Sequence, residues 1–290
     1  MLTDKYLEES GDEVSNEFST LETVLLVWMG LRLRNLSNIE NIGNDYPKWK
    51  NKAIAEFNKY SGTEFGKTKK TSLDMVKNAV VNGVTLTIEN VYNRLKKTDD
   101  KLKKKNILIN GKKDLNKGIK STQNELKNLC NISNKCANKQ FIKACDDAYS
   151  KIIAGQDAEN AIESSIKKLV QNGIEVIGYT KNNTSMDAAV RRAVTSGVNQ
   201  TSLKIKIANC EKFGINIVKT SSHGGARPDH ARWQGQFFYL DKPVKGLKKF
   251  KSSTGYGKVD GLGGANCRHS FYEVTNYEYE NNLVNDEEFE

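Results

Sequence analysis

Proline and histidine are rare in this sequence, at three residues each among 290. Glycine is present at an ordinary 22 residues, and 37% of the residues are hydrophobic. This composition excludes a low-complexity chain and supplies enough apolar residues for a folded core in a polar protein. The length suits one large domain or two modest ones.

A long hydrophobic run is also missing. The longest apolar stretch, residues 23–33 (TVLLVWMGLRL), is interrupted by Arg32. A helix needs about 20 consecutive apolar residues to cross a bilayer. We therefore expect a buried helix at this stretch and no interaction with a membrane.

Cysteines are few, odd in number and widely spaced, and the chain starts with the polar sequence MLTDK rather than a secretion signal. Such a set does not suit a framework of disulfides. We therefore expect reduced thiols in a cytosol. The five residues are Cys130, Cys136, Cys145, Cys210 and Cys267.

Charge is distributed unevenly along the chain. Residues 1–22 have a net charge of −6 and residues 273–290 a net charge of −7, so the total of +10 leaves +23 for the residues between them. A strongly basic body attracts polyanions, of which nucleic acid is the obvious one. A solvated, lysine-rich surface without a partner explains the same charge equally well.

Apolar residues recur at helical spacing in the first third of the chain. The pattern predicts helices over residues 19–33, 49–60 and about 72–95, with breaks at 41–47 and at the Ser-Gly-Thr turn of 61–63. Residues 94–120 then contain eleven Lys or Arg residues, and a short strand and turn are expected at 107–111. We interpret 94–120 as a linker-like stretch that is solvated or that contacts nucleic acid.

The pattern becomes mixed near residue 174. Helices are expected over 158–171, ended by Gly173, and from Met186 to Phe213, ended by Gly214, and strands at 174–179, 215–220, 236–240 and 270–274. Pro228, after a glycine-rich loop, is expected at the first position of a further helix. The sequence thus predicts an α+β fold, with a helical N-terminal region and a small mixed C-terminal module rich in glycine loops. The expected modules are residues 1–120, 121–274 and an acidic tail at 275–290.

All three histidines lie between residues 223 and 269, in the company of Cys267. Residues two apart on an extended segment point to the same side, so Cys267 and His269 can face one point. His223 and His230 flank a tight loop. Together, His223, His230, Cys267 and His269 form a set of three nitrogens and one sulfur that suits tetrahedral zinc.

Two other interpretations use the same residues. In the first, the histidines brace loops within a hydrogen-bonded polar core. In the second, the histidines with Arg227 and Asp229 provide the acid, base and phosphate clamp of a metal-dependent nuclease, with Cys267 as an alternative nucleophile. No spacing in this region identifies a nuclease.

Several separated motifs resemble one family in the family's own order. These are AAVRRAVTSGVNQT (188–201), SHGGARPDHARWQG (222–235), TGYG (254–257) and GGANCRHSFY (263–272). They resemble the phage minor capsid protein 2 family and, more distantly, the head-morphogenesis proteins related to protein F of phage Mu. The resemblance is strong over about residues 155–274. Its motif residues include Arg227, Pro228, Asp229, Trp233, Gly235, Asn266 and Arg268.

The resemblance implies a structural, non-enzymatic minor protein of a tailed-phage head. Such a protein is expected in the virion, at the capsid interior or the portal vertex, and in the cytoplasm of the bacterial host during assembly. The implied partners are the portal and the major capsid protein or scaffold. Mu-type relatives carry Asn-Cys-Arg-Cys where this chain has Asn266-Cys-Arg-His269, an exchange that keeps metal ligation and removes a disulfide.

Charge alone predicts non-specific contact with packaged DNA. The basic side chains that we expect to make it lie in the linker-like stretch and on the helix after residue 186. They are Lys103, Lys104, Lys105, Arg191 and Arg192.

Overall fold

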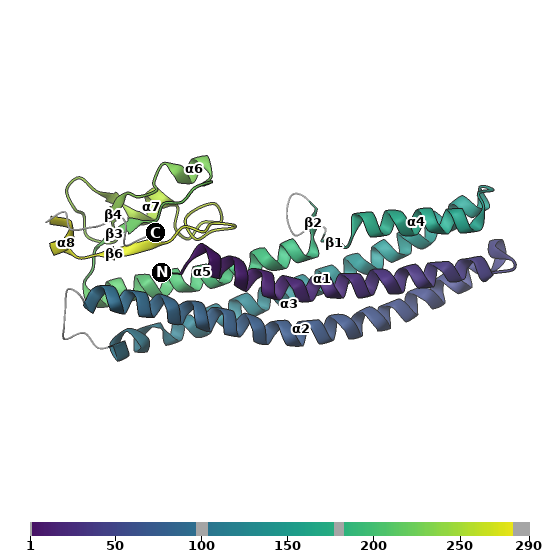
Figure 1. The fold of residues 1–290 in the computed structure, drawn as a ribbon, viewed down its shortest axis with the longest axis horizontal. Coiled ribbons are helices and arrows are strands. Elements are labelled where there is room, and N and C mark those ends of the chain that lie inside the picture. Colours follow the sequence, from purple (N-terminus) through teal and green to yellow (C-terminus); the bar gives the residue numbers. More distant parts are fainter. Residues whose placement is uncertain (1, 97–103, 177–182, 281–290) are drawn as a thin grey trace. The chain divides into compact units, whose positions relative to one another are not determined.

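A computed structural model describes residues 2–96, 104–176 and 183–280 and shows an α+β fold in which helices predominate (Figure 1). The predicted fold class is therefore confirmed. The N-terminal elements are α1 (Asp4–Arg34), the 3-10 helix η1 (Asn35–Asn38), α2 (Ile42–Lys96), α3 (Lys104–Ile153) and α4 (Ala158–Asn172). Among the residues described, no helix combines the length and apolar character needed to cross a membrane.

The C-terminal elements are short, apart from α5 (Met186–Phe213). The strands are β1 (Glu175–Val176), β2 (Thr184–Ser185), β3 (Ile217–Thr220), β4 (Phe237–Tyr239), β5 (Lys248–Lys249) and β6 (Phe271–Val274). The short helices are α6 (Pro228–Ala231), α7 (Phe250–Thr254) and α8 (Asn276–Glu280).

The chain forms two compact units, each assembled from separate stretches of sequence. Unit 1 comprises residues 1–11, 76–123 and 192–290, and unit 2 comprises residues 12–75 and 124–191. Helices α1, α2, α3 and α5 each contribute a segment to both units. The predicted boundaries at residues 120 and 274 concern sequence modules and remain a prediction.

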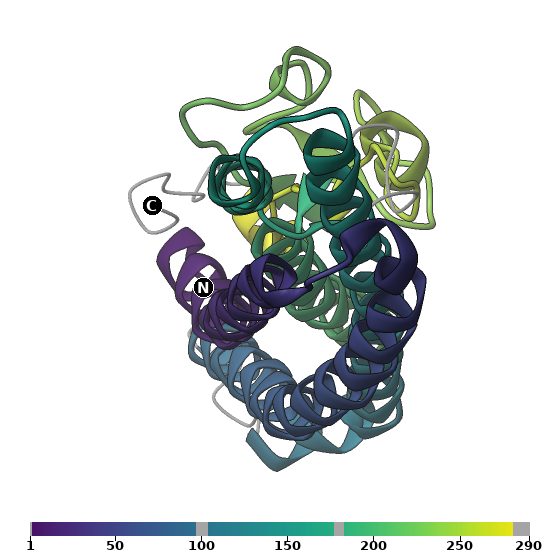
Figure 2. The same ribbon diagram turned by 90° about the vertical axis from the view of Figure 1, so that its right-hand side faces the viewer.

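Aromatic side chains form the centre of unit 2. The Trp28 ring of α1 lies 5.2 Å from the Phe57 ring of α2 and 5.6 Å from the Phe141 ring of α3. Phe57 and Phe141 are fully buried, with ring centroids 4.9 Å apart. Three helices thus bury their apolar faces against one another. Figure 2, which looks along the helices, shows them side by side.

Helix α4 has well-defined ends. The Asp157 carboxylate accepts a hydrogen bond from the Asn160 N–H at 3.0 Å, which satisfies one of the free donors at the helix start. Gly173, at φ 62°, ends the helix in a conformation that suits glycine. The carboxylate of Glu22 on α1 accepts a hydrogen bond from the Ile174 N–H and so ties the end of α4 to α1.

The helices of unit 1 cross at glycines. A Cβ added to Gly118 of α3 would overlap Thr201 of α5, and one added to Gly197 of α5 would overlap Thr122 of α3. The crossing is therefore reciprocal, with a glycine and a threonine four residues apart on each helix. Each threonine hydroxyl donates to the carbonyl of the glycine on its own helix, at 2.9 Å for Thr122 and 2.7 Å for Thr201.

A four-stranded sheet in the order β5-β4-β3-β6 forms the other part of unit 1. Strand β3 pairs antiparallel with β4 and with β6, and β4 pairs parallel with β5. The core beside the sheet contains Phe250 and Phe271, whose rings are 5.0 Å apart. Lys206 of α5, which is almost fully buried, donates to the Phe271 carbonyl at 2.6 Å. Burial lowers the pKa of Lys206.

The helices predicted in the first third exist but are longer than expected. Helix α1 begins at Asp4 rather than near Ser19, and α2 begins at Ile42, so Pro47 lies inside it. The turn predicted at residues 61–63 is wrong, since α2 continues through it. The Ser61 hydroxyl donates to the Asn58 carbonyl, and burial of this serine shows that tertiary packing overrides its weak helix preference.

The strand predicted at residues 107–111 is also wrong, because this segment belongs to α3. Of the strand expected at 174–179, Glu175–Val176 is confirmed, and the remainder from residue 177 lies outside the described residues. The helices expected over 158–171 and up to Phe213 are confirmed. The three later strands are confirmed with slightly shorter bounds.

Candidate metal centre

Two segments of unit 1 bring histidine and cysteine together. His230 lies on α6, where Pro228 occupies the first helical position as predicted, and Cys267 and His269 precede β6. All three side chains are buried, with exposed fractions of 2% for His230, 3% for Cys267 and 1% for His269. The cluster therefore lies in the interior of the unit and not on its surface.

The ligand atoms of these residues converge. His230 Nδ1 is 3.4 Å from His269 Nδ1, and Cys267 Sγ is 3.6 Å from His269 Nδ1. Ligand atoms of all three residues lie within 4.8 Å of one another, so the cluster can hold a metal ion. In a tetrahedral zinc site, bond lengths of about 2.0–2.1 Å to nitrogen and 2.3 Å to sulfur give separations of about 3.3–3.4 Å between two nitrogens and about 3.5–3.6 Å between nitrogen and sulfur. Two of the three separations therefore match a tetrahedral site.

The outer ring nitrogens have carbonyl-type oxygens as partners. His230 Nε2 is 2.8 Å from the Asp260 backbone oxygen, and His269 Nε2 is 2.9 Å from Gln234 Oε1. The Gln234 oxygen only accepts, so His269 Nε2 carries the proton and His269 Nδ1 is left with a lone pair. His230 Nε2 also lies 2.5 Å from Arg227 Nη2, which only donates, so its two partners favour opposite tautomers of His230. A metal bound by both Nδ1 atoms, which lie 3.4 Å apart, requires the tautomer in which His230 Nε2 donates to the Asp260 carbonyl.

Burial keeps one of these rings neutral. Burial, as the largest cause, together with the neighbouring His223, His230 and Arg227 lowers the pKa of His269 to about 3. A neutral imidazole is the form that binds a metal. Burial also raises the pKa of the Cys267 thiol, which favours the protonated thiol as long as no metal is bound.

The fourth predicted ligand, His223, lies beside the cluster but is not one of the three that converge. Its ring centroid is 4.0 Å from that of His269, and its Nδ1 hydrogen-bonds the Gly224 carbonyl at 2.9 Å. Its Nε2 is buried and has no hydrogen-bond partner within the described part of the chain. His223, His230, Cys267 and His269 line one hollow of about 320 Å³.

Two supporting residues were not found by sequence reasoning. Gln234 accepts from the His223 backbone N–H at 2.8 Å as well as from His269, so one amide orients both histidines. Asn199 of α5 donates to the Cys267 carbonyl at 2.8 Å and fixes the segment that carries the thiol. Gln234 lies within the motif of residues 222–235, whereas Asn199 gave no signal of its own for this role.

The remaining motif residues support the same segments. Trp233 packs its ring 4.7 Å from His230 and 4.6 Å from His269. Arg227 lies 3.7 Å from Asp229 and donates to the Asp260 carbonyl at 2.8 Å.

Gly235, at φ 64°, and Asn266, at φ 55°, adopt left-handed conformations, which glycine and asparagine tolerate best. Arg268 forms an ion pair with Glu8.

The predicted nucleic-acid contacts are only partly described. Arg191 is half exposed and forms an ion pair with Asp12 at 2.6 Å, and Arg192 is partly buried. Lys103 lies outside the described residues. Lys104 and Lys105 belong to the first turn of α3, and their backbone alone is described. These contacts stay a prediction.

Fold and site together define a helix-rich α+β protein with a buried His-Cys-His cluster. A profile of the family described as phage minor capsid protein 2 matches residues 2–285, which is nearly the whole chain. The chain therefore belongs to the phage minor capsid protein 2 family and has a structural role in a phage. No curated protein and no solved structure matches it significantly.

Proposed function

We propose that this chain is a minor structural protein of a tailed-phage head, located in the capsid interior or at the portal vertex. The match to the phage minor capsid protein 2 family over residues 2–285 carries the proposal. Its partners are the portal and the major capsid protein or scaffold. Packaged DNA lies close enough for its phosphates to attract the basic residues between the two acidic ends.

Mass spectrometry of gradient-purified particles tests this role. Peptides of the chain are counted against those of the major capsid protein. A low and fixed ratio across preparations is the expected result for a minor virion component. Recovery only in the lysate supernatant, with none in intact particles, contradicts the proposal.

Zinc is the metal that the cluster fits best. His230, Cys267 and His269 would hold it, and His223 would provide the fourth ligand, because its Nε2 is a buried acceptor without a partner in the described residues. The ion would link α6 to the segment before β6, which are almost forty residues apart in sequence. Closing such a loop in a loop-rich module stabilises the folded state. The burial of three donors favours this structural role over an open catalytic site.

Metal analysis of the purified full chain tests the zinc proposal. We expect about one zinc per chain and a melting temperature that falls on chelation. Cys267→Ser and His230→Ala should lose the metal, whereas Cys145→Ser, the same exchange at a buried cysteine of unit 2, should retain it. His223→Ala should bind zinc but release it faster to a chelator. A zinc-free chain after expression with ample zinc, with a melting temperature insensitive to chelation, would refute the site.

Contact with DNA is tested by the salt dependence of binding. Loss of phosphate contacts reduces the slope of log affinity against log salt concentration by about one for each basic residue removed. We expect a triple alanine variant of Lys103, Lys104 and Lys105 to show a smaller slope than the unmodified chain. An unchanged slope excludes these lysines from the contact.

A further inference from the structure

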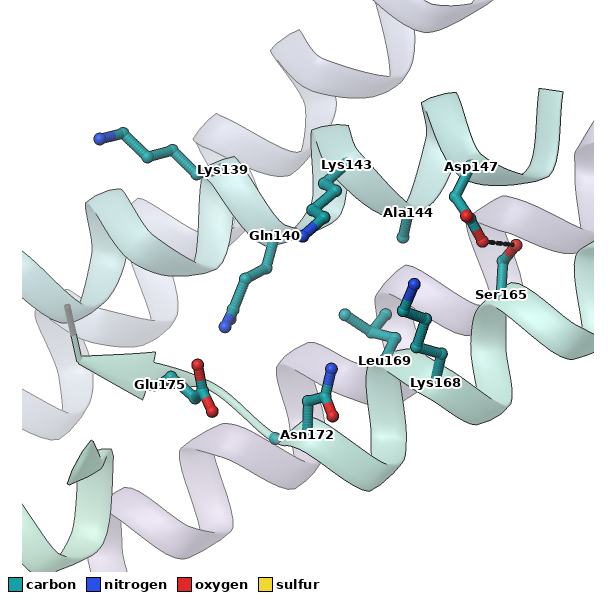
Figure 3. Close-up of a pocket in the computed structure, with 11 residues that line it drawn as sticks. Lys139, Gln140, Lys143, Ala144, Asp147, Ser165, Lys168, Leu169, Asn172 and Glu175 are labelled. Carbon is teal, nitrogen blue, oxygen red and sulfur yellow. Dashed lines mark hydrogen bonds between the residues drawn. The ribbon is translucent and has the colours of Figure 1, made fainter. Parts of the chain in front are cut away.

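A second hollow, of about 200 Å³, lies in unit 2 between α3 and α4. Figure 3 shows its lining side chains, with Gln140 and Lys143 reaching in from α3 and Lys168, Leu169 and Asn172 from α4. The buried side chains of Ala144 and Leu169 form its apolar floor. A cavity of about 150 Å³ holds a benzene ring, so this hollow has room for one aromatic side chain.

The unbalanced charge around the hollow is positive. Lys143 and Lys168 are exposed and make no ion pair with any residue that the structure describes. The acidic groups of the lining are already engaged. Asp147 accepts from Lys151 and from the Ser165 hydroxyl, both at 2.7 Å, and Glu175 accepts from Asn183 at 2.9 Å. A ligand that brings carboxylates to the rim therefore gains two cationic partners.

One buried oxygen of the lining, Gln140 Oε1, has no hydrogen-bond donor among the described residues. An unpaired buried acceptor is costly, and the N–H of a bound peptide backbone satisfies it. The phosphodiester backbone of duplex DNA offers no such donor and no apolar group for the floor, because its bases are stacked inside the helix. The hollow therefore suits an acidic peptide with a bulky apolar side chain better than it suits duplex DNA.

We propose that this hollow binds residues 281–290 of a second copy of the chain. This segment, NNLVNDEEFE, contains four acidic residues and no basic one. Phe289 stands between Glu288 and Glu290, so an aromatic ring for the floor is flanked by carboxylates for Lys143 and Lys168. The proposal concerns contact between copies and does not depend on zinc or on the position of the protein in the virion.

A fluorescently labelled synthetic peptide of residues 281–290 is the probe, and its anisotropy is measured on titration with the full chain. We expect saturable binding that weakens about tenfold in a Lys143→Glu, Lys168→Glu double variant. The control is Lys135→Glu with Lys167→Glu, which changes the same charge at exposed lysines of the same two helices outside the hollow. A peptide with Phe289→Ala should bind at least about tenfold more weakly, because the ring no longer fills the floor.

Sedimentation velocity then decides whether the occupant comes from a second copy. The full chain should self-associate with rising concentration, and Phe289→Ala should weaken that association while the Lys135, Lys167 control leaves it unchanged. Equal loss of peptide binding in both lysine variants, or displacement of the peptide by duplex DNA from the hollow, overturns the proposal. So does a chain that stays monomeric while it binds the peptide.

Discussion

Gly197→Ala should destabilise the protein, although alanine is the better helix former. At this position of α5 a Cβ would lie 2.9 Å from Thr122 Cβ and 2.5 Å from Thr122 Cγ2, with the Thr122 hydroxyl closer still. Real Cβ atoms essentially never come within 3 Å of a non-bonded heavy atom. Threonine is stiff at χ1, and its rotation would break the 2.9 Å hydrogen bond to the Gly118 carbonyl.

The magnitude follows from opposing contributions to the free energy of unfolding. The intrinsic helix preference favours alanine over glycine by about 1 kcal/mol. Overpacking costs about 1–3 kcal/mol, and the lost hydrogen bond costs about 1 kcal/mol more. The expected net result is a destabilisation of about 1–3 kcal/mol. Gly62→Ala on α2 is the matched control, because no atom lies within 4 Å of its Cβ.

Urea unfolding followed by far-ultraviolet circular dichroism measures both variants. Gly62→Ala should stabilise unit 2 by up to about 1 kcal/mol, opposite in sign to Gly197→Ala. Adding Thr122→Ala to Gly197→Ala removes the two closest atoms and should recover at least about 1 kcal/mol in a double-mutant cycle. If Gly197→Ala stabilises the chain as Gly62→Ala does, or if the double variant shows no coupling, the helices do not cross in the reciprocal manner described.

Three further predictions concern the helices and the thiols. Phe141→Ala should destabilise unit 2 by about 3–5 kcal/mol in thermal unfolding, because it empties a fully buried site between Trp28 and Phe57, and a loss below 1 kcal/mol would contradict that packing. Hydrogen bonds from Lys151 and then Ser165 lower the pKa of Asp147 below its usual 3.8, so the stabilisation is present above pH 3.8 and is lost as the pH falls through the folded-state pKa. Asp147→Asn should lower the free energy of unfolding by less than about 1 kcal/mol at pH 7, because the pair is partly exposed, and this difference from the unmodified chain should vanish in acid. A thiol reagent should label the native chain slowly and the unfolded chain fully, because all five cysteines are buried. Burial also raises the pKa of Cys130 to about 11 and of Cys145 to about 12, which keeps these thiols protonated and unreactive. Rapid labelling of a native thiol would show that it is accessible.

Local sequence signals predicted the C-terminal elements well. Gly173 and Gly214 marked helix ends, and Pro228 marked the first position of α6. These signals depend on backbone preferences of single residues, which act whatever the surrounding fold. In the N-terminal part, the same reasoning divided α2 at residues 61–63, because it could not see that burial against neighbouring helices stabilises a serine inside a helix.

The candidate site, too, could be predicted only in part from the sequence. The spacing of Cys267 and His269 indicated that both face one point, and the structure places His230 with them. Gln234 and the Asp260 carbonyl, which lie within hydrogen-bond distance of the outer ring nitrogens of His269 and His230, could not be found in this role, because their positions depend on how loops distant in sequence fold together. His223 lies next to the cluster, and its place as a ligand remains a prediction.

The division of each compact unit among separate stretches of sequence has a consequence during synthesis. Residues 1–11 belong to the same unit as residues 76–123 and 192–290, so they leave the ribosome about 180 residues before the last stretch of their unit. At about 5–20 residues per second this interval lasts roughly 10–40 s, far longer than a helix needs to form. The parts of α1 and α2 that contact α5 in this unit, such as Leu7 beside Thr195 and Gly83 beside Val198, therefore stay uncovered while the chain is elongated. Apolar surface of the kind that chaperones bind is thus exposed during synthesis.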